Sequence, residues 1–509
     1  MSDGAPAILT LAGIAAGADD APAIGAPGRV PLTHAELRAL VKATVGRLGE
    51  LGIGTDDRVA MVLPNGPEMA AAFVAVGAAA ATAPLNPGYR AEELEFYLSD
   101  IGAQALLVAP DDDGPAVQIA ARLGIAVLRL VADASGPAGG FSIAGAALGA
   151  PVERTSPTPA HTALLLHTSG TTSRPKLVPL SHANLIASAG HIGAALALTA
   201  DDRCLNIMPL FHIHGLVAAV LSSLKAGGSV YCTPGFNALS FFGWLKEMRP
   251  SWYSAVPTMH QAILARAPRN EDVLKTAALR FIRSSSASLP PQVMGELEAT
   301  FGCPVIESYG MTEAAHQMSS NPLPPAMRKP GTVGIAAGPE VTIMAEDGRL
   351  LCAGDEGEIV IRGPNVTLGY ENNPAANETA FAHGWFHTGD QGVMDEQGYV
   401  RVTGRRKEII NRGGEKISPR EVDEVLMDHP AVAQVVTFAM PHAKLGEEVA
   451  AAVVLREGAK ADERGIRAFA GERLADFKVP RRVLILEEIP KGATGKLQRI
   501  GLAQKLGLA

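Results

Sequence analysis

Short apolar runs alternate with helical segments through the first 300 residues, and this alternation leaves few folds open to the chain. The run at 58–64 (RVAMVLP) predicts a strand, and the Ala-rich segment at 67–80 predicts a buried helix. The same order of strand and helix returns between residues 229 and 310. Repeated β-α-β units favour parallel sheets with helices on both faces. We therefore expect an α/β fold with a large N-terminal domain of parallel-rich sheets covered by helices.

The pattern changes twice toward the C-terminus. From about residue 340, short strands alternate with Gly/Asp turns, which predicts a small antiparallel lobe of the same domain. A charged linker at Thr403–Lys407 then precedes about a hundred residues that read as helix, two strands, helix and strand. We expect two domains, at 1–403 and 404–509, of which the second is a small α+β domain.

Composition and charge exclude several classes of protein. Of the 509 residues, 47% are hydrophobic and 19% are charged, which excludes a disordered chain. The formal net charge is −8 and no basic run occurs, so we expect neither a nucleic-acid partner nor an anionic membrane. No window holds the roughly 20 strongly apolar residues that a membrane span requires.

The cysteines and the N-terminal segment bear on cellular location. Four cysteines are present without a CxxC pair, so neither a zinc site nor a disulfide framework is supported. A reducing compartment fits this usage best. Asp3 stands where a secretory signal would carry Lys or Arg. We expect a cytoplasmic protein that is a monomer or a homodimer.

The segment at 164–182 (LLLHTSGTTSRPKLVPLSH) carries the strongest chemical signal. An apolar strand runs into a loop of five hydroxyl residues, one glycine and two cations. Such a loop can present N–H and O–H donors around a polyphosphate. It is not the Walker pattern, because GxxxxGK[ST] does not occur. Taken alone, it could equally be a hydroxyl-rich surface turn.

Further motifs follow this loop in a fixed order. They are MPLFHIHGL at 208–216, ESYGMTE at 307–313, GWFHTGD at 384–390, GRRKEIINRGGEKISP at 404–419 and PKGATGKLQR at 490–499. Together with TSGTTSRPK they closely resemble the signatures of the adenylate-forming superfamily, which includes acyl-CoA synthetases, peptide-synthetase adenylation domains and luciferases. The resemblance spans roughly 160 to 500 and implies a ligase that uses ATP, Mg²⁺ and coenzyme A.

The resemblance also implies roles for individual residues. Lys496 is expected to bridge the carboxylate and the α-phosphate, Thr312 to lie beside that phosphate, and Glu313 to bind Mg²⁺. Asp390 and Arg405 are expected at the ribose. The remaining nucleotide-binding positions are Thr168, Ser169, Gly170, Thr171, Thr172, Lys176, Glu307, Ser308, Tyr309, Gly310 and Met311.

Two features concern motion. Lys407 stands at the family's hinge position, which implies a mobile C-terminal domain that alternates between adenylate formation and thioester formation. In the second state Gly414 is expected beside the incoming thiol, since a glycine leaves room for a pantetheine arm; a plain hairpin turn would need the same glycine. Ser173 and Leu177 replace glycines that the family usually has, and Leu177 could slow loop closure if this position needs a positive φ or a close approach of the backbone.

Polar residues around the expected acyl pocket indicate the substrate. His316 follows Glu313 by three residues, Ser286 ends a hydroxyl-rich strand, and His212 lies in FHIHG. An alkyl chain would leave these donors unpaired, at about 1–3 kcal/mol each. The segments SHANL and HQMSSNPLPP are closely similar to the oxalyl-CoA synthetase group, so oxalate is the first expectation. A short- or medium-chain fatty or aromatic acid is the alternative, and a carrier-protein-loading or non-catalytic adenylate-binding protein is a remoter one.

Overall fold

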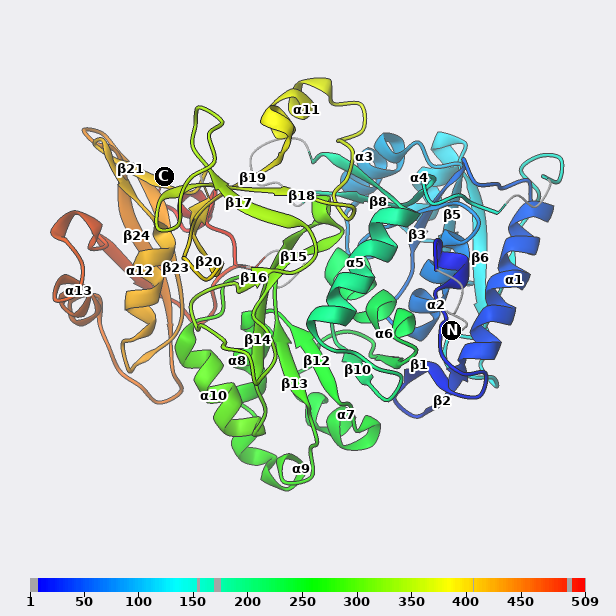
Figure 1. The fold of residues 1–509 in the computed structure, drawn as a ribbon, viewed down its shortest axis with the longest axis horizontal. Coiled ribbons are helices and arrows are strands. Elements are labelled where there is room, and N and C mark those ends of the chain that lie inside the picture. The colour runs from blue at the N-terminus through cyan, green and yellow to red at the C-terminus, as the bar shows by residue number, and fades with distance from the viewer. Residues whose placement is uncertain (1–7, 153–155, 169–174, 406, 492–496, 509) are drawn as a thin grey trace.

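Two large sheets stand side by side with helices between and around them, and a smaller unit lies at one end (Figure 1). The computed structural model describes residues 8–152, 156–168, 175–405, 407–491 and 497–508. Among these, no helix is both long enough and apolar enough to cross a membrane.

The N-terminal sheet has seven strands in the order β7-β6-β5-β3-β4-β8-β9. Its inner pairs are parallel, while β6–β7 and β8–β9 at the two edges are antiparallel. The strands are β3 (Arg58–Val62), β4 (Ala81–Pro84), β5 (Ala105–Val108), β6 (Ala126–Ala132), β7 (Phe141–Ala144), β8 (Thr162–His167) and β9 (Leu177–Ser181). The helices α3 (Ala91–Ile101) and α4 (Pro115–Leu123) pack on it.

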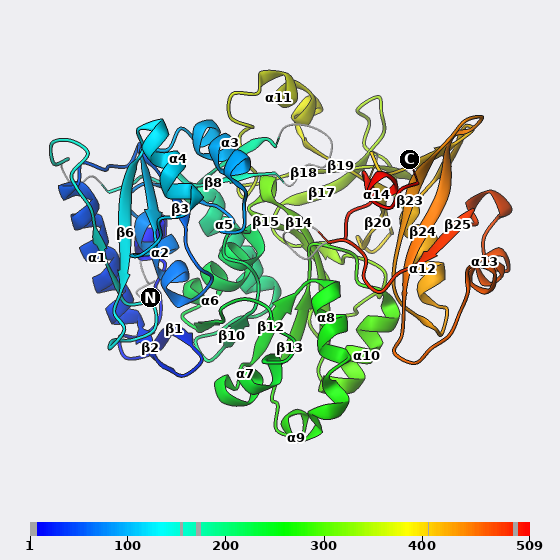
Figure 2. The same ribbon diagram turned by 180° about the vertical axis from the view of Figure 1, so that it is seen from behind.

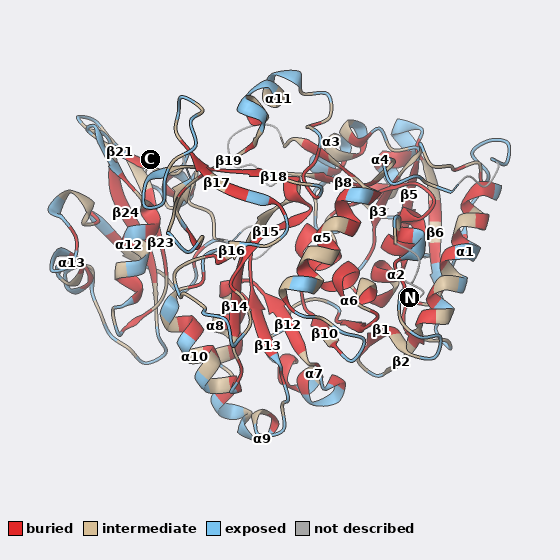
Figure 3. Ribbon diagram, viewed as in Figure 1, coloured by how far each residue is buried: buried red, intermediate tan, exposed pale blue. Residues whose placement is uncertain are grey.

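The second sheet has nine strands in the order β16-β15-β14-β13-β12-β10-β11-β1-β2. They are β1 (Pro22–Ala26), β2 (Arg29–Thr33), β10 (Arg203–Asn206), β11 (Ser229–Cys232), β12 (Trp252–Ala255), β13 (Phe281–Ser284), β14 (Val305–Met311), β15 (His316–Ser320) and β16 (Ile335–Ala336). Strands β10 to β14 pair in parallel, and β12 and β13 are buried along their whole length (Figure 3). The carboxyl ends of parallel strands are where open α/β sheets bind ligands.

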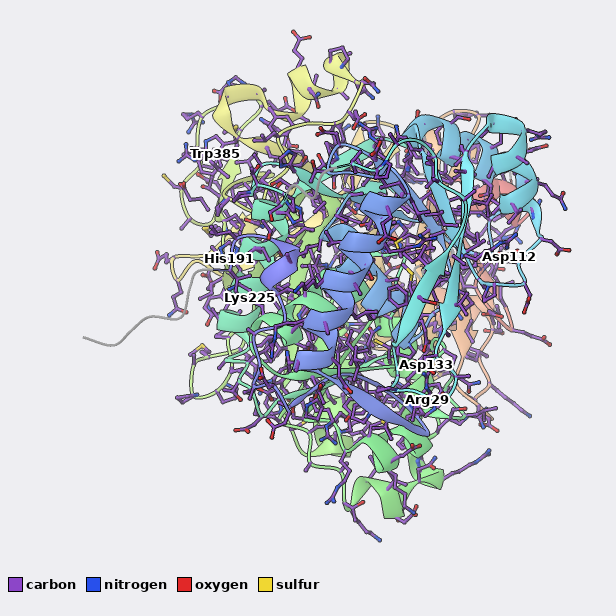
Figure 4. The ribbon with its side chains drawn as sticks, turned by 90° about the vertical axis from the view of Figure 1, so that its right-hand side faces the viewer. Arg29, Asp112, Asp133, His191, Lys225 and Trp385 are labelled. Atoms are coloured by element: carbon purple, nitrogen blue, oxygen red, sulfur yellow. The ribbon has the colours of Figure 1, made fainter. Side chains whose placement is uncertain are left out.

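Helices between the two sheets form the largest core. They are α1 (His34–Glu50), α2 (Pro67–Gly77), α5 (His182–Ala195), the π-helix His214–Leu221 and α6 (Ser222–Lys225). All of α2 except Glu68 is buried, because its alanines let it pack closely against both neighbours. At the edge, Arg29 of β2 donates to the main-chain oxygens of Asp133 and Pro137, which ties the two sheets together (Figure 4).

The rest of the chain forms two smaller sheets. The strands β17 (Glu340–Met344), β18 (Glu356–Arg362), β19 (Phe386–Met394) and β20 (Val400–Arg405) form an antiparallel sheet, beside which lies α11 (Pro374–Ala380). The C-terminal sheet contains β21 (Ile410–Arg412), β22 (Glu415–Ile417), β23 (Val432–His442), β24 (Gly446–Leu455) and β25 (Arg482–Ile485). Its helices are α12 (Pro419–Met427), α13 (Glu463–Gly471) and α14 (Leu502–Lys505).

The C-terminal unit packs against helices that flank the nine-stranded sheet (Figure 2). The helices that contact it are α8 (Pro257–Leu264) and α10 (Pro291–Phe301), while α7 (Phe241–Met248) and α9 (Glu271–Leu274) flank the sheet farther from this unit. Gln261 of α8 donates to the main-chain oxygen of Ala433 at 2.8 Å, and Arg456 pairs with Glu296 of α10 at 3.2 Å. The expected α/β architecture, with an antiparallel lobe and a small α+β C-terminal unit, is confirmed.

Gly310 provides a test of the close packing between β14 and β15. A β-carbon at this position would lie 1.4 Å from the main-chain oxygen of His316, so the two strands would have to separate. We expect Gly310→Ala to lower the free energy of unfolding by about 3 kcal/mol or more, measured by urea denaturation.

The control is Gly295→Ala, which lies in α10 where a β-carbon meets nothing within 4 Å. Alanine is the better helix former there, so this variant should gain about 0.5–1 kcal/mol. Equal unfolding midpoints for the two variants would show that β14 and β15 do not approach so closely.

Candidate active site

The predicted phosphate loop is flanked by an antiparallel strand pair, β8 and β9. The Thr168 N–H donates to the Lys176 main-chain oxygen at 2.9 Å, and the Lys176 N–H donates to Thr168 Oγ1 at 3.1 Å. The predicted residues Ser169, Gly170, Thr171 and Thr172 lie outside the described residues. Leu177 is buried in β9 opposite His167 and has no positive φ. The expectation of a positive φ at this position was wrong, because Leu177 is an ordinary strand residue, while its effect on the closure of the loop stays a prediction.

Tyr370 connects Lys176, at the end of the predicted phosphate loop, to Glu313, the predicted metal ligand. The Lys176 ammonium lies 4.2 Å from the centre of the Tyr370 ring. Tyr370 donates its hydroxyl to Glu313 Oε1 at 2.8 Å, and Glu313 is buried. Burial raises the pKa of the Glu313 carboxyl and lowers that of the Lys176 ammonium. Tyr370 was not predicted, and its position 57 residues after Glu313 gave no signal of the contact.

The predicted ribose-binding residues come together at the end of β14. Tyr309 donates its hydroxyl to Asp390 Oδ2 at 2.6 Å, and Arg405 Nε donates to Asp390 Oδ1 at 3.0 Å. Asp390 is buried, whereas 60% of the Arg405 side chain is exposed. The carboxylate raises the pKa of the Arg405 guanidinium, and burial raises the pKa of the Tyr309 phenol. The ring of Tyr309 and the exposed cation therefore flank one fixed carboxylate.

Glu307 and Ser308 support this region from inside the sheet. Glu307 accepts the Leu289 N–H at 2.9 Å and is fully buried, so burial raises its pKa to about 7. Ser308 is buried, and its main-chain oxygen accepts from Ser285 Oγ at 3.0 Å. Thr312 follows in the short turn between β14 and β15, where its side chain is half-buried.

Two histidines and a serine meet at the carboxyl ends of β10 and β13. The rings of His214 and His316 stack with centroids 4.9 Å apart, and His214 Nδ1 lies 3.1 Å from Ser286 Oγ. Both histidines are buried, while Ser286 is half-buried at the outer side. The predicted His316 and Ser286 are thus joined through His214. The predicted His212 contacts the Phe211 ring at 5.9 Å, and His214 is the residue of FHIHG that bonds Ser286.

A buried arginine lies behind the two imidazoles. Arg283 is in the middle of β13, opposite Ser254 of β12, and none of it is exposed. One terminal nitrogen, Nη2, bonds His316 Nε2 at 3.1 Å and Gln317 Oε1 at 3.2 Å. The other, Nη1, bonds Ser254 Oγ at 3.3 Å and reaches His214 Nε2 at 3.4 Å. Sequence reasoning missed Arg283, although a charged residue in the apolar strand RFIRSSS was a signal.

The predicted hinge lies just beyond the ribose-binding residues. The Lys407 charge is close enough to lower the pKa of Lys176, in addition to the larger effect of burial. Glu408 pairs with Arg499 at 3.3 Å, which ties the hinge to the segment that follows Lys496. Lys496 itself lies outside the described residues. Gly414 has a φ of +106° and is exposed, and a β-carbon there would meet nothing within 4 Å.

Comparison with known proteins identifies the family of the chain. The AMP-binding enzyme family model matches residues 12–371, and the AMP-binding enzyme C-terminal domain matches residues 421–496. The oxalate–CoA ligase of Arabidopsis thaliana is 47% identical over 492 residues, covering 95% of each chain. That of Saccharomyces cerevisiae is 40% identical over 473 residues, covering 88% of this chain and 86% of the yeast protein.

The chain therefore belongs to the AMP-binding enzyme family. The predicted class, an AMP-forming acyl-CoA synthetase that uses ATP and coenzyme A, is confirmed. Among solved structures, ATP-bound MatB from Rhodopseudomonas palustris is 31% identical over 98% of both chains with a TM-score of 0.86. Apo MatB gives a TM-score of 0.78 over the same share of both chains. The whole chain therefore superposes better on the ATP-bound structure of MatB than on the apo structure.

The raised pKa of Glu307 makes the stability of the fold depend on pH. Between pH 4.5 and about 7 the carboxyl is protonated in the folded chain but ionised in the unfolded chain. The free energy of unfolding should therefore fall by up to about 3 kcal/mol as the pH rises through this window. Glu307→Gln imitates the protonated form and should remove most of this slope, measured by urea denaturation between pH 4.5 and 8.

The control is Glu457→Gln, which replaces an exposed carboxylate and should keep the wild-type slope. If Glu307→Gln shows the same pH dependence as the wild type, the Glu307 carboxyl is ionised in the folded chain.

Proposed function

We propose that the enzyme activates oxalate to oxalyl-CoA. The observation that carries this proposal is the cluster of His214, His316 and Ser286 at the carboxyl end of the nine-stranded sheet. Its donors suit a second carboxylate, whereas an alkyl or aryl group would leave them unpaired at about 1–3 kcal/mol each. The similarity to the Arabidopsis and yeast oxalate–CoA ligases supports the same substrate.

The first step joins two anions, so it needs positive charge around the reacting atoms. An oxygen of one oxalate carboxylate attacks the α-phosphorus of ATP, and pyrophosphate leaves. We assign Lys176 and Lys496 to the phosphates and the attacking carboxylate, with Thr312 beside the α-phosphate. Asp390, between Tyr309 and Arg405, is assigned to the ribose hydroxyls. In the second step the thiol of coenzyme A attacks the acyl carbon and AMP leaves.

Magnesium fits this site through Glu313. The ion prefers few protein carboxylates and takes its other ligands from phosphate oxygens and water. Glu313 offers one buried carboxylate that Tyr370 holds in a single orientation. When bound, Mg²⁺ would neutralise charge on the phosphates.

We also propose that two domains take part in the reaction and change their relative position between adenylate formation and thioester formation. We assign residues 1–403 to an adenylation domain and 404–509 to a C-terminal domain that turns about Lys407. The better superposition on ATP-bound than on apo MatB supports an adenylate-forming arrangement here. The exposed Gly414, with free space around it, is consistent with a residue that reaches the thiol path only after rotation. The free thiols of all four cysteines support a cytoplasmic location.

A coupled assay of pyrophosphate release tests the substrate. Oxalate, hexanoate and 4-coumarate would each be supplied with ATP and Mg²⁺, with and without coenzyme A. We expect the highest kcat/KM with oxalate, and continuous turnover only when coenzyme A is present. A preference for hexanoate or 4-coumarate would overturn the assignment of oxalate while leaving the ligase class intact.

Separate half-reactions test the two domain positions. Lys496→Ala should lose most oxalyl-adenylate formation but still convert supplied oxalyl-AMP and coenzyme A to the thioester, because Lys496 acts only in the first state. Gly414→Leu should do the reverse, since its side chain would obstruct the thiol path. Quenched-flow experiments measure the rate of each half-reaction separately. If either variant slows both half-reactions equally, the two-state assignment is contradicted.

His316→Ala tests the acyl pocket. Removing one charge-assisted hydrogen bond, at about 1.5–3 kcal/mol, should raise KM for oxalate by roughly 10- to 100-fold and leave KM for ATP within about twofold. His191→Ala is the control, because His191 lies on α5 near Lys225 (Figure 4) and should change neither constant. An effect of His316→Ala confined to KM for ATP would remove His316 from the oxalate site.

A further inference from the structure

Arg283 places a full positive charge in the core of the nine-stranded sheet. The guanidinium is completely buried, and none of the ion pairs between described residues includes it. Burial lowers its pKa only to about 9, so it stays charged near neutral pH. A buried charge without a counter-ion is strongly unfavourable, and such charges are normally paired or serve a ligand. The structure therefore points to an anion that completes the site.

The hydrogen bonds around Arg283 can run in one direction only. A guanidinium donates and cannot accept, so Ser254 Oγ and His316 Nε2 must accept from it. Ser254 then has its own proton to donate, and His214 Nε2 accepts it at 2.6 Å. Each imidazole is thereby left with its proton on Nδ1. His214 donates that proton to Ser286 Oγ at 3.1 Å, which leaves the Ser286 hydroxyl proton as the outermost donor.

Nearby residues reinforce this arrangement. His316 has a φ of +99°, an unusual conformation for a residue with a β-carbon, and as the first residue of β15 it pairs with Met311 of β14. Gln317 Oε1 accepts from the same arginine nitrogen, while its Nε2 donates to the Ala337 main-chain oxygen at 3.2 Å. The amide is thus oriented with its oxygen toward the guanidinium, and no described contact offers Arg283 a negative charge.

We propose that Arg283 is a positioning residue that locks His214 and His316 in the Nδ1–H form, so that the pocket presents only donors to the distal carboxylate of the substrate. The inference rests on the proposed dicarboxylate substrate. Arg283 does not touch the substrate, because it is fully buried behind the imidazoles. It acts through them: its charge offsets that of the second carboxylate, while Ser286 and His316 make the contacts. A monocarboxylate of similar size gains nothing from this arrangement.

Arg283→Met tests the lock, because methionine fills similar space without charge or donors. We expect KM for oxalate to rise by about 10- to 100-fold while KM for ATP stays within about twofold. In ¹⁵N-histidine NMR spectra of the ligand-free wild type, His214 and His316 should show protonated Nδ1 and unprotonated Nε2. In Arg283→Met the two rings should shift toward a mixture of both tautomers. Spectra of His316→Ala assign the resonances.

Arg280→Met is the matched control, three residues earlier on the same segment. Arg280 pairs with Asp202 at 2.9 Å, so its loss should lower the melting temperature without changing KM for oxalate or the histidine tautomers. Should Arg283→Met fold poorly, Arg283→Lys keeps the charge but cannot bond Ser254 and His316 together, and a smaller rise in KM is expected.

The outcomes separate this inference from the proposed function. Nε2–H tautomers or doubly protonated rings in the wild type would overturn the lock, whatever the enzyme's activity with oxalate. Equal increases in KM for oxalate with Arg283→Met and Arg280→Met would reduce Arg283 to a structural residue. If the wild type does not turn over oxalate, the proposed function falls, and the tautomers still report on the lock itself.

Discussion

The burial of one guanidinium in the middle of β13 determines much of what the proposed acyl pocket can bind. The guanidinium of Arg283 only donates hydrogen bonds, so every atom that hydrogen-bonds to it must be an acceptor. This fixes the direction of the bonds through Ser254 and His214 to Ser286. It also keeps the imidazole of His316 neutral, since its Nε2 is already an acceptor. The positive charge of the pocket thus comes from the arginine, and the two histidines contribute hydrogen-bond donors rather than charge.

Charge is divided between the two ends of the active site. At the proposed nucleotide end, Lys176 and the exposed Arg405 lie near the buried carboxylates of Glu313 and Asp390. At the acyl end, a buried cation has only neutral partners among the described residues. A dianionic acid that must approach ATP needs such an excess of positive character at its far end.

Most of the fold could be predicted from the sequence, because alternating strands and helices and the Gly/Asp turns after residue 340 have direct structural meaning. The motifs indicated Glu313, Asp390 and His316, whose neighbours in the chain carry the family signatures. The hydrogen-bond partners of the site residues could not be predicted in this way. Tyr370 reaches Glu313 across 57 residues, and Ser254 meets Arg283 only because β12 and β13 are adjacent in the sheet. Spacing along the chain does not encode which strands pair. The contacts of Arg283 with the two histidines could therefore not be predicted from the sequence.

The central claim is that buried donors recognise the second carboxylate of the substrate. It is tested most directly by the ratio of kcat/KM for oxalate to that for oxamate, which has nearly the same shape but carries an amide in place of one carboxylate. A pocket of donors with a buried cation behind it should favour oxalate by about 2–4 kcal/mol, or roughly 30- to 1,000-fold, because the amide N–H groups would face other donors. Equal values for the two acids would contradict the account.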